Sequence, residues 1–290
     1  MAQPVSIRVI GSINLDIVAT GKTLPRAGET VTGAHLAYHP GGKGANQALA
    51  ARKLGANVTL FGAIGADDAA DQSLALMLAN GINLSGVKVV KDMPTGVALI
   101  AVDTGGENQI VVAPGANAAV TFENLGDISR DNYDATICQL EIPIATLEAV
   151  AMRVTGFFVI NLAPAQPVSA AVLTRADLII VNETEAAFYG EALHNLPGLL
   201  VVTLGGKGAV MYQNGAGRLE AKPPRVIPVD TTGAGDTFVG ALVVALMEGQ
   251  SRQDALNFAC AAGAAATQIA GAQPSMPNRV TVLALLAAPR

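Results

Sequence analysis

The segment Asp230–Phe238, with the sequence DTTGAGDTF, combines residue types that can bind and transfer a phosphoryl group. Apolar residues precede it and the strongly helical stretch Phe238–Met247 follows it, so its Gly-Ala-Gly stands where a strand gives way to a helix. Unpaired N–H groups and the dipole of a helix N-terminus attract anions, and small residues let a phosphate approach the backbone. We therefore predict an anion hole at Gly233, Ala234 and Gly235.

Asp236 directly follows this anion hole, where a carboxylate indicates a general base that accepts a proton from the attacking hydroxyl. Aspartate is also a favoured N-cap residue of helices, because its side chain accepts a hydrogen bond from a free backbone N–H. The motif alone does not separate the base from the cap, and one residue can serve as both.

A second glycine-rich segment, Thr203–Gly208, follows the apolar strand Leu199–Val202 and could pass over the phosphates of a nucleotide, with Lys207 nearby. Taken alone, it is more typical of an ordinary turn into Ala209–Tyr212. Other motifs fail: Asp16 stands where a P-loop ending in Gly21-Lys22-Thr23 needs its first glycine, and Gln47 replaces the last glycine of a dinucleotide fingerprint. Zinc-ligand spacing and a histidine-centred triad are not indicated either.

Polar residues that suit a polyol follow several predicted strands. Asn14 and Asp16 come just after the first strand, Gly42, Lys43 and Asn46 open a helix, and Glu141 follows a later strand. Ligands of open α/β sheets bind at the carboxyl ends of the strands, where carboxylates and amides can hydrogen-bond adjacent hydroxyls. Each segment seen alone is better explained by caps and turn residues; together they predict a sugar site.

The elements that would position these residues alternate between strand and helix. Short aliphatic runs such as Ile7–Ile10, Val58–Phe61 and Asp177–Val181 indicate buried strands, and helical spacing in Lys43–Leu54 ends before Gly55. This rhythm predicts an α/β fold with a mostly parallel central sheet between helices on both faces. Further elements are expected at Gln72–Asn80, Ala135–Leu140, Leu147–Val154, Phe158–Asn161 and Leu199–Leu204.

Two stretches depart from this rhythm, at about residues 14–40 and 95–114. Both alternate in polarity, as in the segment Glu29–Thr32, which is typical of a strand. Both also contain turn residues, as in the turn Asp103–Glu107. We predict that they form a small antiparallel sheet, a lid beside the main one. Because neither a repeat nor a low-complexity linker is evident, residues 1–290 are expected to form a single domain.

Composition narrows the class of protein. Hydrophobic residues make up 51% of the chain and charged residues 14%, which is sufficient for a large core. The net charge of −5 and the lack of a basic cluster argue against a nucleic-acid partner. The sequence shows neither a signal peptide nor an apolar run of the ~18 residues that a membrane span needs. With two distant cysteines expected to be reduced, we predict a cytoplasmic protein with no membrane partner.

Taken together, these segments resemble the ribokinase-like carbohydrate kinases, the PfkB family, in family order over nearly the whole chain. The most specific matches are Gly41–Ala48 (GGKGANQA) and Asp230–Phe238; the others are Gly11–Asp16, Gly115–Ala118, Asn182–Glu185 (NETE), Thr203–Gly208 and Gly271–Ser275 (GAQPS). The resemblance implies a three-layer sandwich with a lid, and transfer of the γ-phosphate of ATP to the primary hydroxyl of a pentose, D-ribose by preference, to give ribose 5-phosphate.

The resemblance also implies a role for each residue. Asp236 is the base, with the anion hole at Gly233, Ala234 and Gly235. The sugar is held by Asn14, Asp16, Gly42, Lys43, Asn46 and Glu141. ATP is bound by Asn182, Glu185, Thr203, Gly205, Gly206, Lys207, Gly208, Gly235 and Cys260, with Asn182 and Glu185 near the phosphates and Mg²⁺. An activating K⁺ is held by Asp230, Thr232, Ala266, Ile269, Gly271 and Ser275, several through backbone carbonyls.

The chain departs from the family pattern at three places. The segment 186–202 is shorter than expected, Leu162 stands where proline is usual, and Cys260 stands where a histidine or asparagine often lies near the adenine. A homodimer through the exposed lid edges is expected. Alternatives that the sequence leaves open are a kinase for a nucleoside, fructose, a tagatose-type sugar or a keto-deoxy sugar acid, a non-catalytic sugar-binding sensor, and a nicotinamide oxidoreductase.

Overall fold

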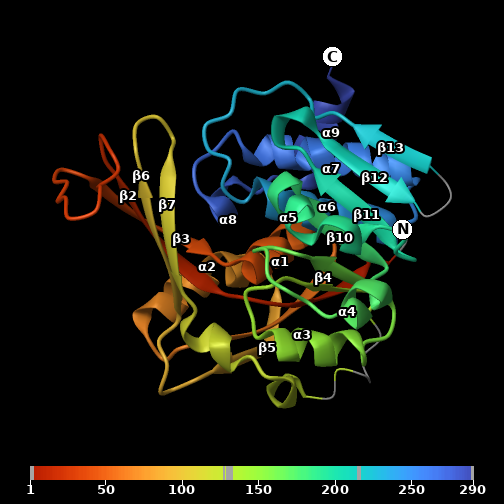
Figure 1. Ribbon diagram of the computed structural model, residues 1–290, viewed down its shortest axis with the longest axis horizontal. Helices are drawn as coiled ribbons and strands as arrows, with labels where there is room; N and C mark the ends of the chain where they lie inside the picture. Colours follow the sequence, from red (N-terminus) through yellow and green to blue (C-terminus); the bar gives the residue numbers. More distant parts are fainter. Residues whose placement is uncertain (1–2, 127, 129–132, 214–216, 289–290) are drawn as a thin grey trace.

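A computed structural model describes residues 3–126, 128, 133–213 and 217–288. Within these residues the chain forms an α/β fold with one large and one small sheet (Figure 1), as the alternation predicts. The strands of the large sheet are β1 Ser6–Ile10, β4 Asn57–Ile64, β5 Asn83–Val89, β8 Ala135–Cys138, β9 Phe157–Asn161, β10 Leu178–Asn182, β11 Leu199–Thr203, β12 Ala209–Gln213 and β13 Gly217–Ala221.

The order of the large sheet creates a crevice at its middle. The strands lie in the order β13-β12-β11-β10-β9-β8-β1-β4-β5, and only the pairings made by β12 are antiparallel. From β1 the chain adds β4 and β5 on one side, then crosses to β8 and continues to β11 on the other side. Helices that leave adjacent strands in opposite directions open a crevice at the strands' carboxyl ends. The β1/β8 boundary is therefore where a ligand site is expected.

Helices cover both faces of this sheet (Figure 1). On one face lie α1, α6 and α7, with α9 packed against α7; the other face carries α3, α4 and α5. The helices are α1 Lys43–Lys53, α2 Asp68–Ala79, α3 Ile144–Ala151, α4 Ala170–Arg175, α5 Glu183–Tyr189, α6 Ala234–Met247, α7 Arg252–Ala266, α8 Ala272–Ser275 and α9 Arg279–Ala287, with 3-10 turns η1 Gly115–Ala119, η2 Phe122–Leu125, η3 Gly190–Leu193 and η4 Gly205–Lys207.

The alternation of side chains along the strands divides the core into two layers. Ile137 and Val159 belong to the cluster under α1 and α6, whereas their neighbours Cys138 and Ile160 belong to the cluster under α3 and α4. Strands buried on both faces need continuous apolar runs, which is why the sequence pattern located them. Cys138 and Cys260 are both free and buried, one in each cluster, so the sheet separates the two thiols.

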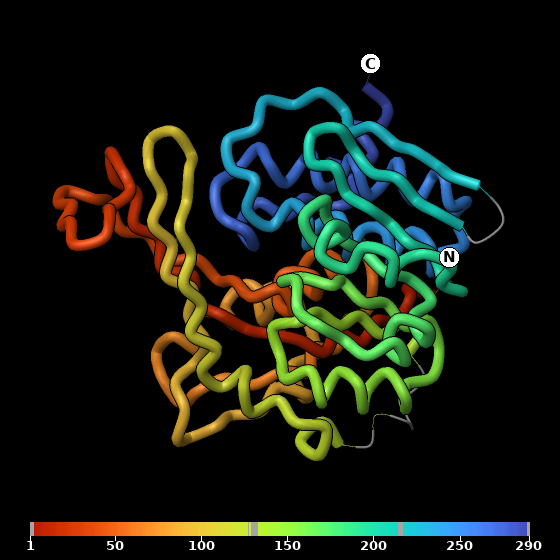
Figure 2. Tube along the Cα trace, in the orientation of Figure 1, coloured from red at the N-terminus to blue at the C-terminus, as the bar shows by residue number. Residues whose placement is uncertain are grey.

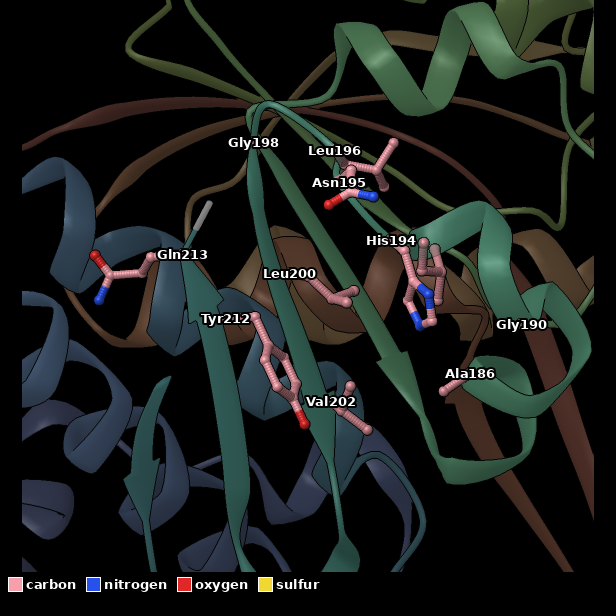
Figure 3. A pocket seen from close by; sticks show the side chains of 11 residues that line it. Ala186, Gly190, His194, Asn195, Leu196, Gly198, Leu200, Val202, Tyr212 and Gln213 are labelled. Atoms are coloured by element: carbon pink, nitrogen blue, oxygen red, sulfur yellow. The ribbon is translucent and has the colours of Figure 1, made fainter. Parts of the chain in front are cut away.

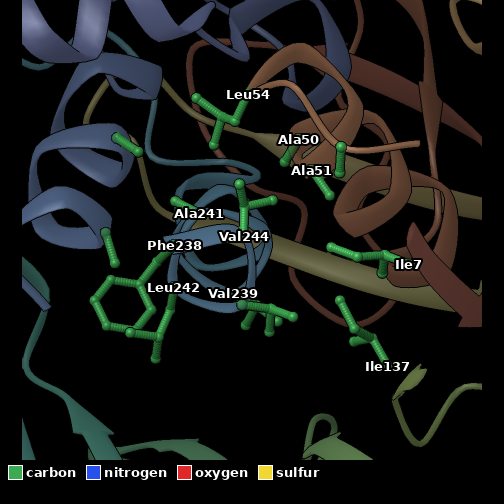
Figure 4. Close-up of a cluster of buried hydrophobic side chains, with 14 of the residues drawn as sticks. Ile7, Ala50, Ala51, Leu54, Ile137, Phe238, Val239, Ala241, Leu242 and Val244 are labelled. Carbon is green, nitrogen blue, oxygen red and sulfur yellow. The ribbon is translucent and has the colours of Figure 1, made fainter. Parts of the chain in front are cut away.

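Helix α6 is buried over most of its length, from Asp236 to Ala245 (Figure 4). Gly240 lies where α6 crosses α1: a Cβ on it would come within 2.9 Å of the Cβ of Ala50 and of the N of Ala51. The missing side chain lets the two helices approach closely. One turn earlier on each helix, the same close approach brings Asp236 beside Asn46 and Gln47.

The smaller sheet extends to one side of the main body, together with the loop that follows β2 (Figure 2). It contains β2 Asn14–Thr20, β3 His35–Gly41, β6 Gly96–Val102 and β7 Asn108–Ala113 in the order β3-β2-β6-β7. The prediction of a purely antiparallel sheet is wrong, because β2 and β6 pair in parallel. The alternating stretch Glu29–Thr32 is not a strand either, since it lies in the exposed connection between β2 and β3.

The other expected elements are found with shifted ends. The helix expected at Gln72–Asn80 begins earlier, because the side chain of Asp67 caps α2 by accepting a hydrogen bond from the N–H of Ala70. The helix expected at Leu147–Val154 is α3, which starts at Ile144 directly after Pro143. The helices of the described residues include none that is both long and apolar enough to cross a membrane.

Candidate active site

The carboxyl end of β1 meets the start of α1 in a contact that only glycines allow. A Cβ on Gly44 would lie 2.5 Å from the carbonyl carbon of Gly11, and a Cβ on Gly42 would lie 2.7 Å from the N of Asn14. Gly42 also has a φ of +88°, a left-handed conformation that side chains disfavour. These glycines bring three of the predicted sugar residues, Asn14, Lys43 and Asn46, to one end of the crevice.

The anion-hole segment begins helix α6. Gly233 is the N-cap residue in a left-handed conformation, and it packs against Ala272, whose Cα lies 2.8 Å from where a Cβ of Gly233 would be. A Cβ on Gly235 would meet nothing within 4 Å, so open space lies in front of this part of the helix. The N-terminus of α6 is therefore accessible to an anion.

Asp236 does not cap this helix. The N-cap position is occupied by Gly233, with no side-chain cap hydrogen bond, and the carboxylate of Asp236 turns instead toward α1. Its Oδ2 accepts a hydrogen bond of 2.9 Å from Nδ2 of Asn46, and its Oδ1 accepts one of 2.9 Å from Nε2 of Gln47. The structure thus excludes the N-cap interpretation and places this carboxylate beside a predicted sugar residue.

Glu141 and Asn14 are held in part by Ser12 and Asn117, which are not among the predicted site residues. Glu141 accepts hydrogen bonds at Oε2 from Oγ of Ser12 at 2.5 Å and from N of Lys43 at 3.1 Å, which joins the end of β8 to β1 and α1. Asn117 donates from Nδ2 to Oδ1 of Asn14 at 2.7 Å. Because Oδ1 of Asn14 is used in this bond, its side-chain nitrogen Nδ2 can serve as a donor to a ligand.

Charged groups converge in this crevice. Burial is the largest single influence on the pKa of Lys43 and acts to lower it, because it disfavours the charged form. Four nearby carboxylates together outweigh burial and raise this pKa above the ordinary value: those of Asp236, Glu141, Glu185 and Asp16. Burial, assisted by Glu141 and Asp236, raises the pKa of Asp16 to about 7. The site thus concentrates negative charge around one buried ammonium, which suits a ligand rich in hydroxyl donors.

A cavity of about 140 Å³ lies between these elements. It is lined by residues from all three predicted groups: Lys43 of the sugar set, Gly233, Gly235 and Asp236 of the catalytic set, and Asn182, Glu185 and Thr203 of the nucleotide set. These residues come from α1, α5, the start of α6 and the ends of β10 and β11. The fold therefore joins the three predicted groups around one volume.

Asn182 and Glu185 form a reciprocal capping box at the start of α5. Glu185 Oε2 accepts from the N of Asn182 at 2.8 Å, and Asn182 Oδ1 accepts from the N of Glu185 at 2.8 Å. Burial raises the pKa of Glu185, although the hydrogen bond from Asn182 opposes this. The two residues thus stabilise a helix start and line the cavity at once.

The remaining predicted nucleotide residues lie outside that cavity lining. Gly205–Lys207 is a 3-10 turn between β11 and β12, and Lys207 is largely exposed, 3.8 Å from a carboxylate oxygen of Glu183. Gly208 needs to be glycine, since a Cβ there would lie 1.9 Å from the carbonyl oxygen of Ala221. Cys260 is buried in α7 with Sγ 3.7 Å from the same carbonyl oxygen, and burial raises the pKa of its thiol to about 12.

The predicted cation loop connects two segments distant in the sequence. Asp230 accepts hydrogen bonds of 2.8 Å from the N of Thr232 and from the N of Gly271, and despite the opposing effect of burial these donors lower its pKa. Ser275 donates from Oγ to the O of Ala272 at 2.8 Å, which leaves its hydroxyl oxygen as an acceptor. Carboxylate, hydroxyl and carbonyl oxygens are the ligands that hard cations prefer, so the donor set fits an alkali cation.

The protein offers fewer ligands for Mg²⁺ than the loop of Asp230 and Ser275 offers for an alkali cation. The described residues contain no group of three or more histidine, cysteine or acidic side chains that could hold a metal ion. Magnesium is commonly bound through one or two carboxylates together with substrate phosphates. Glu185, which lines the cavity, fits that smaller role.

Sequence reasoning missed several amides behind the site. Gln47, Gln139, Asn161 and Asn117 are buried and hydrogen-bonded to one another or to predicted site residues. Gln47 lies inside the conspicuous GGKGANQA segment and Asn117 inside the matched segment Gly115–Ala118, so the sequence carried a signal for both. Gln139 directly follows β8 and Asn161 ends β9, with nothing in the local pattern to mark them.

A larger cavity of about 460 Å³ lies elsewhere, on the α5 face of the sheet (Figure 3). Leu200, Val202 and Tyr212 of β11 and β12 form its floor, with His194 above them. The helix in the short segment 186–202 ends at Tyr189, so it leaves this part of the sheet uncovered. The predicted site residues are not among those that line this cavity.

Comparison with known proteins gives consistent results. Residues 5–279 match the pfkB family of carbohydrate kinases. The ribokinase of Bacillus subtilis is 38% identical over 97% of this chain and 99% of its own length, and that of Haemophilus influenzae is 36% identical over 97% and 98%. The solved ribokinase of Thermotoga maritima superposes with a TM-score of 0.89 at 34% identity, and the match covers 98% of this chain and 100% of that one. The ribokinase of Arabidopsis thaliana, solved in complex with ribose and ATP, superposes with a TM-score of 0.87 at 32% identity, and the match covers all of both chains.

Proposed function

The chain belongs to the pfkB family of carbohydrate kinases, and from this membership we propose that it transfers the γ-phosphate of ATP to the primary hydroxyl of D-ribose, giving ribose 5-phosphate. The observation that carries the proposal is the hydrogen bond between Asn46 and Asp236 at the wall of the cavity, because it joins the predicted sugar site to the predicted base. The similarity to ribokinases over nearly the full length supports ribose as the sugar.

The sugar would bind at the β1/β8 crevice beneath the small sheet. Asp16 and Glu141 would accept hydrogen bonds from sugar hydroxyls, whereas Asn14, Lys43 and Asn46 would donate them. Gly42 would act through the backbone, because its missing side chain lets the start of α1 lie against Asn14. Polar groups fixed by their own hydrogen bonds, such as Glu141 by Ser12, bind a polyol at a low cost in side-chain entropy.

The chemical step would take place at the start of α6. The N–H groups of Gly233 and Gly235 would stabilise charge on the transferred phosphoryl group, and Asp236 would accept the proton of the attacking hydroxyl. The third predicted donor, the N–H of Ala234, instead donates to the O of Thr231 at 3.2 Å. In phosphoryl transfer, positioning and charge stabilisation account for most of the catalysis. The positive end of the helix dipole lies at the same place and acts in the same direction.

ATP would lie along the carboxyl ends of β10 and β11. Asn182, Glu185 and Thr203 would face its phosphates, Gly205, Gly206, Lys207 and Gly208 would border the nucleotide, and Cys260 would lie near the base. Mg²⁺ bound with ATP would neutralise phosphate charge, and Glu185 would be the protein carboxylate that helps to hold it. The ATP and ADP complexes of related ribokinases support a nucleotide site in this fold.

A K⁺ ion would be held by Asp230 and Ser275 with the carbonyls of Thr232, Ala266, Ile269 and Gly271. The loop that contains these residues packs on the anion hole, since Ala272 touches Gly233. An ordered loop would therefore keep Gly233 in its left-handed conformation and the N–H groups directed at the phosphate. The monovalent cation would supply charge and order at a distance from the reacting atoms.

We also propose a homodimer through the small sheet. Strand register places Leu36, Tyr38, Leu99 and Val111 on one face of this sheet, opposite to the face of Asp16, and each is about half or more exposed. An exposed apolar face of this kind is typical of an interface. A second copy of the chain would cover it with the same face by two-fold symmetry.

An ADP-release assay with ATP, Mg²⁺ and K⁺ tests the function directly. The panel contains D-ribose, fructose, a tagatose-type sugar, a keto-deoxy sugar acid and adenosine. We expect ribose to give the highest kcat/KM. A higher value for another acceptor would reassign the substrate, and binding of a sugar without ADP release would show a sensor and not an enzyme.

A further inference from the structure

Behind Asp236 lies a line of three buried amides that belong to none of the predicted binding groups. Gln47 on α1, Gln139 after β8 and Asn161 at the end of β9 come from separate parts of the chain. Gln47 and Gln139 are completely buried and Asn161 is 7% exposed. Buried amides are costly unless they are hydrogen-bonded, so their arrangement calls for a physical account.

Gln47 uses all of its hydrogen-bonding groups but one lone pair. Its Nε2 donates to Oδ1 of Asp236 at 2.9 Å and to Oδ1 of Asn161 at 3.0 Å, and its Oε1 accepts from Nε2 of Gln139 at 2.7 Å. An amide that donates both hydrogens and accepts at its oxygen cannot rotate without losing bonds. Gln47 is therefore held with its nitrogen facing the carboxylate.

A main-chain carbonyl sets the direction of this line. Asn161 donates from Nδ2 to the O of Ile180 at 3.1 Å, and a carbonyl oxygen can only accept. Asn161 must therefore present its oxygen to Gln47, and Gln47 must present its nitrogen to Asn161 and Asp236. Gln139 then donates to the oxygen of Gln47. The backbone of β10 thus dictates, through two side chains, that Asp236 receives a hydrogen-bond donor.

Helix packing makes this contact possible. Gly240 of α6 lets its helix approach Ala50 and Ala51 of α1, and Asp236 and Gln47 lie one turn earlier on their helices. Asn46 holds the other carboxylate oxygen of Asp236 but is itself a proposed sugar ligand. Gln47 is completely buried and is not among the residues that line the cavity.

From this geometry we infer that Gln47 is a positioning residue for the phosphoryl transfer: the Ile180–Asn161–Gln47 line fixes the orientation of the Asp236 carboxylate. When the sugar arrives and competes for Asn46, the hydrogen bond from Gln47 keeps Oδ1 in place and leaves Oδ2 toward the attacking hydroxyl. The inference rests on the proposed function, because it assigns Asp236 the part of the base.

Two substitutions of nearly the same size separate this role from packing. Gln47→Met keeps the length of the side chain but neither donates nor accepts, and Gln47→Glu keeps the shape but, when ionised, presents only acceptors to Asp236. We expect both to lower kcat about 10- to 100-fold, the range in which misplacement of a reacting group lies. The dissociation constant for ribose, measured by calorimetry, should stay within about threefold, because the sugar ligands are unchanged.

Ser73→Ala serves as the matched control, because Ser73 is also a fully buried polar residue, bonded to the O of Ala70 in α2, but lies outside the site. We expect it to leave kcat unchanged even if the melting temperature falls. Wild-type kcat for Gln47→Glu, or a parallel loss of ribose binding and kcat in both variants, would overturn the positioning role.

A double-mutant cycle makes the result independent of the substrate assignment. Gln47→Met, Asp236→Leu, which removes both acceptor oxygens, and the double variant are compared by melting temperature. If Gln47 holds Asp236, the two shifts should not add, since the second change acts on a contact already lost. Additive shifts would overturn the inference, whereas a wild-type protein that fails to phosphorylate ribose but shows non-additive shifts would overturn only the proposed substrate.

Discussion

Asn46 donates a hydrogen bond of 2.9 Å to Asp236 across 190 positions of sequence, joining the first helix of the chain to α6. This contact lies at the wall of a cavity that also contains Lys43 and the start of α6. A residue proposed to bind the sugar thus touches the proposed base directly. Occupation of the sugar site and placement of the base are therefore coupled in this fold.

The first prediction concerns Asp236. Asp236→Asn keeps the shape of the side chain but removes its ability to take a proton, and we expect kcat to fall at least about 10²-fold. Ribose binding, measured by calorimetry, should persist because Asp16, Lys43 and Glu141 remain. Turnover close to that of the wild type would refute the assignment of the base.

Gly235 offers a test of the anion hole that does not disturb the fold. A Cβ at this position meets nothing within 4 Å, so Gly235→Ala should keep or slightly raise the melting temperature. The added methyl enters the space proposed for the phosphate, and we expect kcat to fall about 10²-fold as phosphate contacts to the amides are lost. Gly44→Ala, whose Cβ would strike Gly11, should instead lower stability. A fully active Gly235→Ala enzyme would place the phosphate elsewhere.

The loop of Asp230 and Ser275 predicts dependence on a monovalent cation. Replacing K⁺ with tetramethylammonium should lower kcat/KM, because the larger ion does not fit a set of oxygen ligands. Asp230→Asn should make the enzyme insensitive to this exchange. Equal rates of the wild-type enzyme in both salts would show that the loop is purely structural.

Asp16 predicts a pH dependence of stability. Its pKa is raised to about 7 from an ordinary value of 3.8, chiefly by burial. Between these values the folded protein binds more protons than the unfolded one, so its contribution to stability is full below about pH 4 and is lost as pH rises through about 7. The free energy of unfolding of Asp16→Asn, relative to the wild type, should therefore increase between pH 5 and pH 8 in urea titrations. Glu107→Gln, in an exposed turn, is the control, and a pH-independent difference for Asp16→Asn would contradict the shift.

The exposed face of the small sheet predicts self-association. Light scattering should give the mass of a dimer, and Leu99→Glu should convert it to a monomer by placing a charge in an apolar interface. Val280→Glu, at another exposed apolar position on α9, should leave the mass unchanged. A wild-type protein of monomeric mass would exclude the interface.

The sequence by itself determined the α/β class, the separate small sheet and the glycine-rich junction at the start of α6. Each depends on a local property: continuous apolar runs such as Ile7–Ile10 report burial, and Gly233 and Gly235 report a backbone that must lie close to something. Local patterns predicted the ends of helices and strands less well than their centres. Asp67 caps α2 before the point at which apolar spacing becomes visible.

Tertiary structure decided which polar groups meet and in which direction their hydrogen bonds run. Three contacts between separate parts of the chain show this. Strand β2 pairs in parallel with β6, and the amide of Asn117 donates to Asn14. A line of hydrogen bonds runs from Ile180 through Asn161 and Gln47 to Asp236. An amide is the same in sequence whether it presents its oxygen or its nitrogen. Only its partners, brought together by the packing of α1 on α6 and of both helices on the sheet, fix that choice.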